Sequence, residues 1–238
     1  MYVDDAAFVD WDSVPEATWA KTQLLYVCSP GNPTGAVMPL DEWRKLFALQ
    51  DRHGFVIASD ECYSEIYFRD EPPLGGLEAA VQLGRTDFRG LVAFTSLSKR
   101  SNVPGMRSGF VAGDSSLIRK FLLYRTYHGC AMPVQTQLAS IAAWNDEVHV
   151  RANRALYREK FDAVLEILSP VLDVQRPDGS FYLWPNVAGD DAALTRANTV
   201  LNERVVQAAT ALATAEGIAK AALLREETAR GSSDASRR

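Results

Sequence analysis

The stretch "LVAFTSLSKRSNVPGMRSGFVAGD", residues 91–114, joins two apolar runs through a segment of small polar residues that carries a lysine and an arginine. The first run, "LVAFTS", predicts a buried strand, and "RSGFVAGD" predicts a second strand after a Pro-Gly turn. Lys99 follows the first strand directly, and Arg107 stands where the second begins. Because burying an amine is costly unless a partner uses it, this stretch indicates a binding or catalytic site.

Two further apolar runs lie upstream, and each has the length of a buried strand. They are "QLLYVC", residues 23–28, and "FVIASD", residues 55–60, with a predicted helix at 39–54 between them. Strands that are apolar throughout and separated by helices predict an α/β fold, in which a mainly parallel central sheet carries helices on both faces. Downstream, the sequence predicts helices at 115–128, 133–144 and 146–169, and a hairpin-like pair of short strands around "PDG", residues 177–179.

Composition argues against several classes of protein. The chain has 238 residues and a formal net charge of −5, so a nucleic-acid-binding surface is not expected. No apolar run has the length of a membrane span, and the acidic start "MYVDDAAFVDWD" lacks the basic and apolar regions of a signal peptide. The three scattered cysteines suit a reducing cytoplasm, and neither they nor the histidines have zinc-site spacing. We therefore expect a cytoplasmic protein without a metal site, a membrane partner or a nucleic-acid partner.

Polar side chains follow the first three predicted strands, and Arg107 stands at the start of the fourth. In a parallel α/β sheet, ligands bind outside the carboxyl ends of the strands, so these side chains are expected to share one crevice. Each alone has an ordinary structural explanation as a turn residue, a helix cap, a packing residue or a surface charge. Separate explanations of this kind account poorly for the occurrence of the whole set at strand ends. The set consists of Asn32, Asp60, Tyr63, Ser96, Ser98, Lys99 and Arg107.

One ligand has a chemical group for every member of this set. It needs an aldehyde that reacts with the Lys99 amine and a protonated ring nitrogen that Asp60 can hold. It also needs a phosphate for Arg107 and the serine hydroxyls, and a ring oxygen for the amide and the phenol. That ligand is pyridoxal 5′-phosphate, whose cationic ring acts as an electron sink.

The segments "SPGNPTG", "SDECYSEIYF" and "SLSKRSNVPGMRSGFVAGD" resemble the class I/II aminotransferases of fold type I, in residue type and in spacing, over about residues 21–190. The resemblance implies a fold-type I large domain with part of a smaller α+β domain, and a pyridoxal-phosphate-dependent enzyme. It also assigns roles toward the cofactor. Lys99 binds it covalently, Asp60 pairs with the ring nitrogen, Asn32 and Tyr63 bond the ring oxygen, Ser96 and Arg107 hold the phosphate, and Ser98 is a further phosphate candidate.

Within the family, the lysine segment together with "FYLWPNV" is most similar to the succinyldiaminopimelate transaminases of bacterial lysine biosynthesis. This implies amino transfer between glutamate or 2-oxoglutarate and N-succinyl-LL-2,6-diaminopimelate, in a homodimer with active sites at the interface. Other possibilities stay open. They are a transaminase for aspartate, alanine or aromatic amino acids, a carbon–sulfur lyase, and a catalytically silent remnant that still binds the cofactor.

The chain departs from the family pattern at both ends. No segment matches the family's upstream phosphate turn and ring-stacking aromatic residue, or its downstream carboxylate-binding arginine. The C-terminal arginines, Arg225, Arg230, Arg237 and Arg238, stand in a different context. We therefore expect a fragment, whose tail after about residue 195 is either truncated or frame-shifted sequence or a divergent helix. The expected organisation is a partial large domain at 1–145, an interdomain helix and partial small domain at 146–228, and a disordered tail at 229–238.

Overall fold

The computed structural model describes residues 9–129, 131–185, 192, 195–196, 198–204 and 206–207. These residues fall into two compact units. The first holds the chain up to Ala163 together with Val174–Pro185, and the second holds Val164–Asp173 and the residues after Pro185. All candidate site residues belong to the first unit. Cys130, the four C-terminal arginines and the tail at 229–238 lie outside the described residues, and the domain boundaries at 145 and 228 stay predictions.

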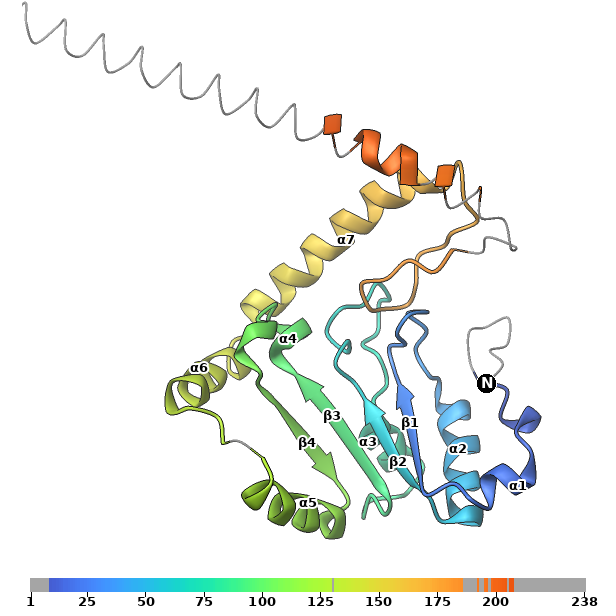
Figure 1. The fold of residues 1–238 in the computed structure, drawn as a ribbon, viewed down its shortest axis with the longest axis vertical. Coiled ribbons are helices and arrows are strands. Elements are labelled where there is room, and N and C mark those ends of the chain that lie inside the picture. Colours follow the sequence, from blue (N-terminus) through green and yellow to red (C-terminus); the bar gives the residue numbers. More distant parts are fainter. Residues whose placement is uncertain are drawn as a thin grey trace, which may run out of the picture. The chain divides into compact units, whose positions relative to one another are not determined.

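A four-stranded sheet in the order β1-β2-β3-β4 forms the centre of the first unit (Figure 1). β1, β2 and β3 are parallel, whereas β4 runs antiparallel to β3 at the edge. This confirms the predicted α/β fold with a mainly parallel sheet. The strands are β1 Leu24–Cys28, β2 Val56–Asp60, β3 Leu91–Ser96 and β4 Gly109–Gly113.

The longer helices lie where the sequence predicts them. Gly54, in the left-handed conformation at φ +78°, ends the helix that begins at Leu40. The Asp114 carboxylate caps the helix that begins at Ser115, through the N–H groups of Ser116 and Leu117. The helices are α1 Glu16–Trp19, α2 Leu40–His53, α3 Gly76–Gln82, α4 Leu97–Arg100, α5 Ser115–Tyr127, α6 Val134–Trp144 and α7 Val148–Leu168, with short 3₁₀ turns at Trp11–Ser13 and Pro104–Met106. No helix in the described ranges is both long enough and apolar enough to cross a bilayer.

One side of the sheet, the packed face, is the face that carries Leu25, Ile57 and Leu91, which lie next to one another in the strand register. Helices α2 and α3 cover it, and Trp43 and Leu46 of α2 are fully buried in the same apolar cluster. Complete burial of such side chains contributes about 1.5–3 kcal/mol each, so this layer supplies much of the unit's hydrophobic stabilisation.

The opposite side, the open face, carries Tyr26, Ala58 and Phe94, because side chains alternate along a strand. Helix α5 reaches this side, and its Phe121 ring lies edge-on to the Phe94 ring at 6.4 Å. The cover is incomplete, since Tyr26 in β1 is 70% exposed. Helices thus occupy both faces, as predicted, but they cover them unequally.

The predicted hairpin around "PDG" is wrong for the described residues. Gly179 instead forms an antiparallel bridge with Tyr67, its N–H donates to the Gly35 carbonyl at 2.9 Å, and the Ser180 N–H donates to the Ile66 carbonyl at 2.8 Å. Gly35 permits this approach, because a Cβ there would lie 2.5 Å from the Gly179 oxygen and its φ is +74°. The backbone groups that would pair within a hairpin are therefore satisfied by two other loops.

Candidate active site

The sheet topology brings the predicted site residues to one edge. Asp60 ends β2 and Ser96 ends β3, while Lys99 lies in the single turn of α4 that follows. Because β4 is antiparallel, its start lies beside the end of β3, with Gly109 opposite Ser96. Arg107 stands just before that start, so the direction of β4 brings the guanidinium segment to the same edge as the lysine.

Asp60 and Lys99 both influence the pKa of Cys62. Burial raises the pKa of the Cys62 thiol to about 12, a hydrogen bond to the Asp60 carboxylate and its charge add to the effect, and the Lys99 charge opposes it. The thiol therefore bonds to the acid and also responds to the charge of the amine. The Lys99 Nζ atom is 5.8 Å from the centre of the Tyr63 ring and 5.5 Å from that of Phe181, within the range of cation–π attraction.

Asn32 is connected to the same cluster from the loop after β1. Its backbone N–H donates to the Cys28 thiol, whose pKa is raised to about 11 by burial and then by the Asp60 charge. Cys28 and Asp60 are neighbours in the strand register. The Asn32 residue itself is exposed.

Tyr63 is buried, and its phenol is 3.2 Å from the Tyr182 hydroxyl. Burial raises the Tyr63 pKa, and the hydrogen bond with Tyr182 raises it further. A neutral phenol both donates and accepts a hydrogen bond. Tyr63 is therefore held as a hydrogen-bonding group and not as an anion.

The two serines predicted to bind phosphate belong to a hydrogen-bond network at the start of α4. The Ser96 hydroxyl accepts from the Ser98 backbone N–H at 3.0 Å and so caps α4. It also lies 2.8 Å from the Ser98 hydroxyl and 3.0 Å from the Ser108 carbonyl. Since the Ser108 carbonyl can only accept, the Ser96 hydrogen serves that contact and the Ser98 hydroxyl donates to Ser96, so the network at the start of α4 engages both hydroxyls.

Arg107 is exposed and has a backbone φ of +53°, in the left-handed region that non-glycine residues seldom adopt. Such conformations cost about 1–3 kcal/mol and are concentrated at functional sites. One guanidinium nitrogen, Nη1, donates to the Pro104 carbonyl at 3.0 Å. The remaining guanidinium N–H groups have no partner among the described residues and can bind an anion.

Two aromatic residues of the cluster are absent from the predicted site. Phe181 lies edge-on to Tyr63 at 5.2 Å, and Tyr182 supplies the hydroxyl that faces the Tyr63 phenol. Both stand in "FYLW", a segment recognised in the sequence only as a marker of a subfamily. Its place beside Lys99 depends on backbone bonds to the loops at 35 and 66, which local sequence patterns do not predict.

Comparison with known proteins supports the resemblance seen in the sequence. The family described as "Aminotransferase class I and II" matches residues 2–228, a longer stretch than the 21–190 over which the motifs could be followed. A crystal structure of an aminotransferase from Neisseria meningitidis is 57% identical and superposes with a TM-score of 0.77, over 82% of this chain and 50% of that one.

Two further proteins show the same relationship at lower identity. A probable aminotransferase of Mycobacterium tuberculosis is 38% identical over 162 residues, which is 68% of this chain and 38% of that protein. A probable N-succinyldiaminopimelate aminotransferase from Thermus thermophilus is 25% identical with a TM-score of 0.71, over 82% of this chain and 52% of the other. The chain thus spans about half, or less, of the length of these proteins. It belongs to the class I and II aminotransferase family.

Proposed function

We propose that this chain binds pyridoxal 5′-phosphate through Lys99 and serves amino-group transfer between glutamate or 2-oxoglutarate and a second amino or keto acid. The observation that carries the proposal is the position of the Lys99 amine. It lies over the Tyr63 ring and near the Phe181 ring, at the edge where Asp60 ends β2. An amine, an acid and a phenol at one strand edge form a donor set that matches this cofactor.

The donors present fit the group. We assign phosphate binding to the exposed Arg107 guanidinium and to Ser96, with Ser98 as a further candidate, and Arg is suited to phosphate because its N–H groups form a planar fork. Asp60 can accept a hydrogen bond from a protonated ring nitrogen. Tyr63 and Asn32 provide a phenol and an amide for the ring oxygen.

The chain's own residues have separate tasks in the proposed reaction. The bound cofactor supplies an electron sink for negative charge that develops on the substrate α-carbon. Lys99 would act on the proton of that carbon, first as base and then as acid. The aromatic rings of Tyr63 and Phe181 lie within cation–π range of the amine and help to hold it in place.

For the substrate we propose N-succinyl-LL-2,6-diaminopimelate, which would place the protein in lysine biosynthesis. Support comes from the likeness to the Thermus thermophilus protein of that name and from the "FYLW" segment, whose Phe181 and Tyr182 lie within the site. We also infer a homodimeric, cytoplasmic enzyme. The free thiols of Cys28 and Cys62 agree with a reducing compartment.

A cofactor titration tests the proposal. Purified chain is titrated with pyridoxal 5′-phosphate while the absorbance of the amine-bound cofactor is followed, and glutamate is then added. We expect a saturable band that Lys99→Ala abolishes, whereas Lys120→Ala on α5 leaves it unchanged. Loss of the band on adding glutamate would show amino transfer, and a panel of keto acids would then separate the succinylated substrate from aspartate, alanine and aromatic ones.

Two results would contradict the proposal. An unaltered band in Lys99→Ala would remove the lysine from the site. A normal band that glutamate does not change would show a chain that binds the cofactor without transferring the amino group.

A further inference from the structure

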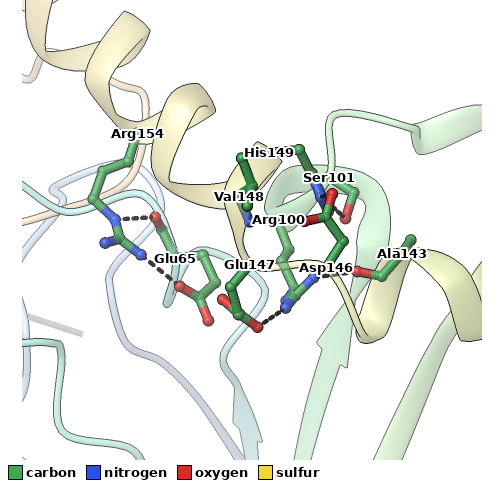
Figure 2. Close-up of polar contacts among 9 residues, drawn as sticks. All are labelled: Glu65, Arg100, Ser101, Ala143, Asp146, Glu147, Val148, His149 and Arg154. Atoms are coloured by element: carbon green, nitrogen blue, oxygen red, sulfur yellow. Dashed lines mark hydrogen bonds and ion pairs between the residues drawn. The ribbon is translucent and has the colours of Figure 1, made fainter.

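The corner between α6 and α7 contacts the lysine-bearing turn α4 at consecutive residues (Figure 2). The Asn153 side chain donates to the Lys99 carbonyl at 3.4 Å, while Arg100 and Ser101 each bond to residues of the corner. These residues lie more than 40 positions further along the chain. The backbone of the proposed cofactor lysine and the two residues after it are thus bonded to a segment that lies outside the strand edge.

Arg100 makes the most buried of these contacts. Its side chain is only 5% exposed, its Nη1 donates to the Ala143 carbonyl at 2.8 Å, and its Nη2 forms an ion pair with Glu147. The guanidinium also lies over the Trp144 ring, 4.9 Å from its centre. A buried charge that loses its partners is strongly destabilised, so this geometry fixes the α4 turn against α6.

Ser101 is joined to the corner through His149. The His149 Nε2 atom is 2.8 Å from the Ser101 hydroxyl, and its Nδ1 atom is 2.7 Å from the Asp146 carboxylate. Hydrogen bonds from His149 and from the Val148 N–H lower the Asp146 pKa, so the carboxylate is an acceptor and Nδ1 carries the hydrogen. Nε2 is then the atom that accepts from the Ser101 hydroxyl.

Helix α7 also holds the loop that carries Tyr63. Arg154 donates from Nε to the Glu65 carbonyl at 2.9 Å and from Nη2 to the Glu65 carboxylate at 2.7 Å, as Figure 2 shows. Its guanidinium stacks on the Tyr67 ring at 3.9 Å. One turn further, Arg158 donates to the Arg69 carbonyl at 3.0 Å. Helix α7 therefore forms hydrogen bonds to both the α4 turn, which carries Lys99, and the loop that carries Tyr63.

We propose that the segment from Ala143 to Arg158 sets the position of the Lys99 amine relative to the Tyr63 ring, with His149 and Arg154 as positioning residues that touch neither cofactor nor substrate. The proposal rests on the proposed function, because it concerns how the lysine is presented. The α4 turn is a single turn and the 61–65 loop forms no helix, so neither is rigid by itself. Their separation is determined by the helix that bonds to both.

The order Ser101, His149, Asp146 also resembles the nucleophile, base and acid of an acyl-transfer site. Two features assign it a positioning role. Asp146 is 48% exposed, whereas the acid of such a site is buried, and its pairing with His149 is an ordinary contact three residues apart on one helix start. Covalent labelling of Ser101 by a serine-directed fluorophosphonate would overturn this assignment.

The chain offers a matched control for the test. Arg85, like Arg154, pairs with a carboxylate, bonds a second oxygen and lies over an aromatic ring, in this case with Asp51, Gln50 and Phe47. The side chains of Arg85 and Arg154 are similarly exposed, at 21% and 17%. Arg85 holds α2 and no site segment, so Arg85→Met reports the general effect of losing such an arginine.

The experiment has two arms on the full chain. Hydrogen–deuterium exchange without cofactor follows peptides covering 61–69 and 97–101, and cofactor titration measures the apparent dissociation constant of the Lys99 band. We expect faster exchange at 61–69 in Arg154→Met and at 97–101 in Ser101→Ala, with about tenfold weaker cofactor capture in each. Ser101→Thr keeps the hydroxyl and restores both values, and Arg85→Met changes neither.

The outcomes separate the two proposals. If the unaltered chain fails to form the band, the proposed function is wrong, and the exchange arm still decides whether the helix holds both segments. If the unaltered chain forms the band but Arg154→Met and Ser101→Ala bind as tightly as Arg85→Met, the positioning role is wrong and the proposed function stands.

Discussion

The two faces of the central sheet differ sharply, although they share the same strands. On the packed face, Leu46 of α2 is 0% exposed, whereas Leu122 of α5, the helix on the open face, is 65% exposed. The strands repeat the contrast, since Leu25 is half-buried and its neighbour Tyr26 is exposed. Asp60 and Ser96 end their strands on the open face, so the candidate site lies beside the less covered layer.

The packed face supplies much of the stability of this unit, whereas the open face lies beside its candidate site. A continuous apolar cluster with α2 and α3 holds the strands in register, and the register in turn fixes Asp60 opposite Cys28. The open face contributes less packing but carries the site residues and a row of exposed apolar side chains on α5. An exposed apolar surface of this kind favours association with other molecules.

Identical substitutions on the two faces give the largest expected contrast. Leu46→Ala should lower the free energy of unfolding by about 2–5 kcal/mol, because it leaves a cavity under α2. Leu122→Ala should change it by no more than about 0.5 kcal/mol, because little burial is lost. Urea-induced unfolding followed by circular dichroism measures both, and equal losses would show that the open face is packed after all.

Charged substitutions on α5 test the exposed apolar surface of the open face and leave the core unchanged. The double change Leu122→Glu and Tyr127→Glu should reduce the binding of an apolar fluorescent dye and lower light scattering at high protein concentration, since both side chains are exposed. Secondary structure should be unchanged. Dye fluorescence equal to that of the unaltered chain would locate the accessible apolar surface elsewhere.

Asp114 joins β4 to α5 on the open side, and its pKa is lowered from 3.8 to about 2, mainly by the Gly90 N–H and then by Ser116. A lowered pKa means that the folded chain favours the charged carboxylate, so the stabilisation is present above pH 3.8 and is lost as the pH falls through about 2. Asp114→Ala should cost about 1 kcal/mol at neutral pH, as for loss of an N-cap. Thermal unfolding at several pH values would show the gap closing in acid, and a constant gap would contradict the assignment.

The pKa of Glu61, on the packed side, is shifted in the opposite direction to that of Asp114. Burial raises its pKa above 4.5, although its carboxylate accepts from the Gly76 N–H and the Ser59 hydroxyl, each at 2.8 Å. The folded chain therefore favours the protonated acid, and this contribution is full below pH 4.5 and declines as the pH rises through the raised value. Glu61→Gln should gain stability relative to the unaltered chain with rising pH, and a difference independent of pH would exclude a buried titrating group.

Apolar runs in the sequence were enough to predict the strands and the longer helices. The rule that ligands bind at carboxyl ends of parallel strands was enough to predict that Asp60 and Lys99 share an edge. Both inferences depend only on local pattern and on topology, which burial enforces strongly. The neighbourhood of Cys62 agrees with them, since both charges act on its thiol.

Other features depend on contacts between distant segments and escaped prediction. The "PDG" segment contains good turn residues, yet its backbone groups pair with the loops at Gly35 and Ile66. Ser96 is used as a helix cap, a role that "SLSK" does not distinguish from phosphate binding. The contacts of α7 with both site segments depend on His149, Asn153 and Arg154, which look like ordinary helix-surface residues in the sequence.

Chemical trapping tests the central claim most directly. The chain is incubated with pyridoxal 5′-phosphate, reduced with borohydride, digested and examined by mass spectrometry to find which lysine carries the cofactor. We expect a single modified peptide containing Lys99, with the yield strongly reduced in Asp60→Ala. Modification spread over several surface lysines, with Lys99 unmodified, would contradict it.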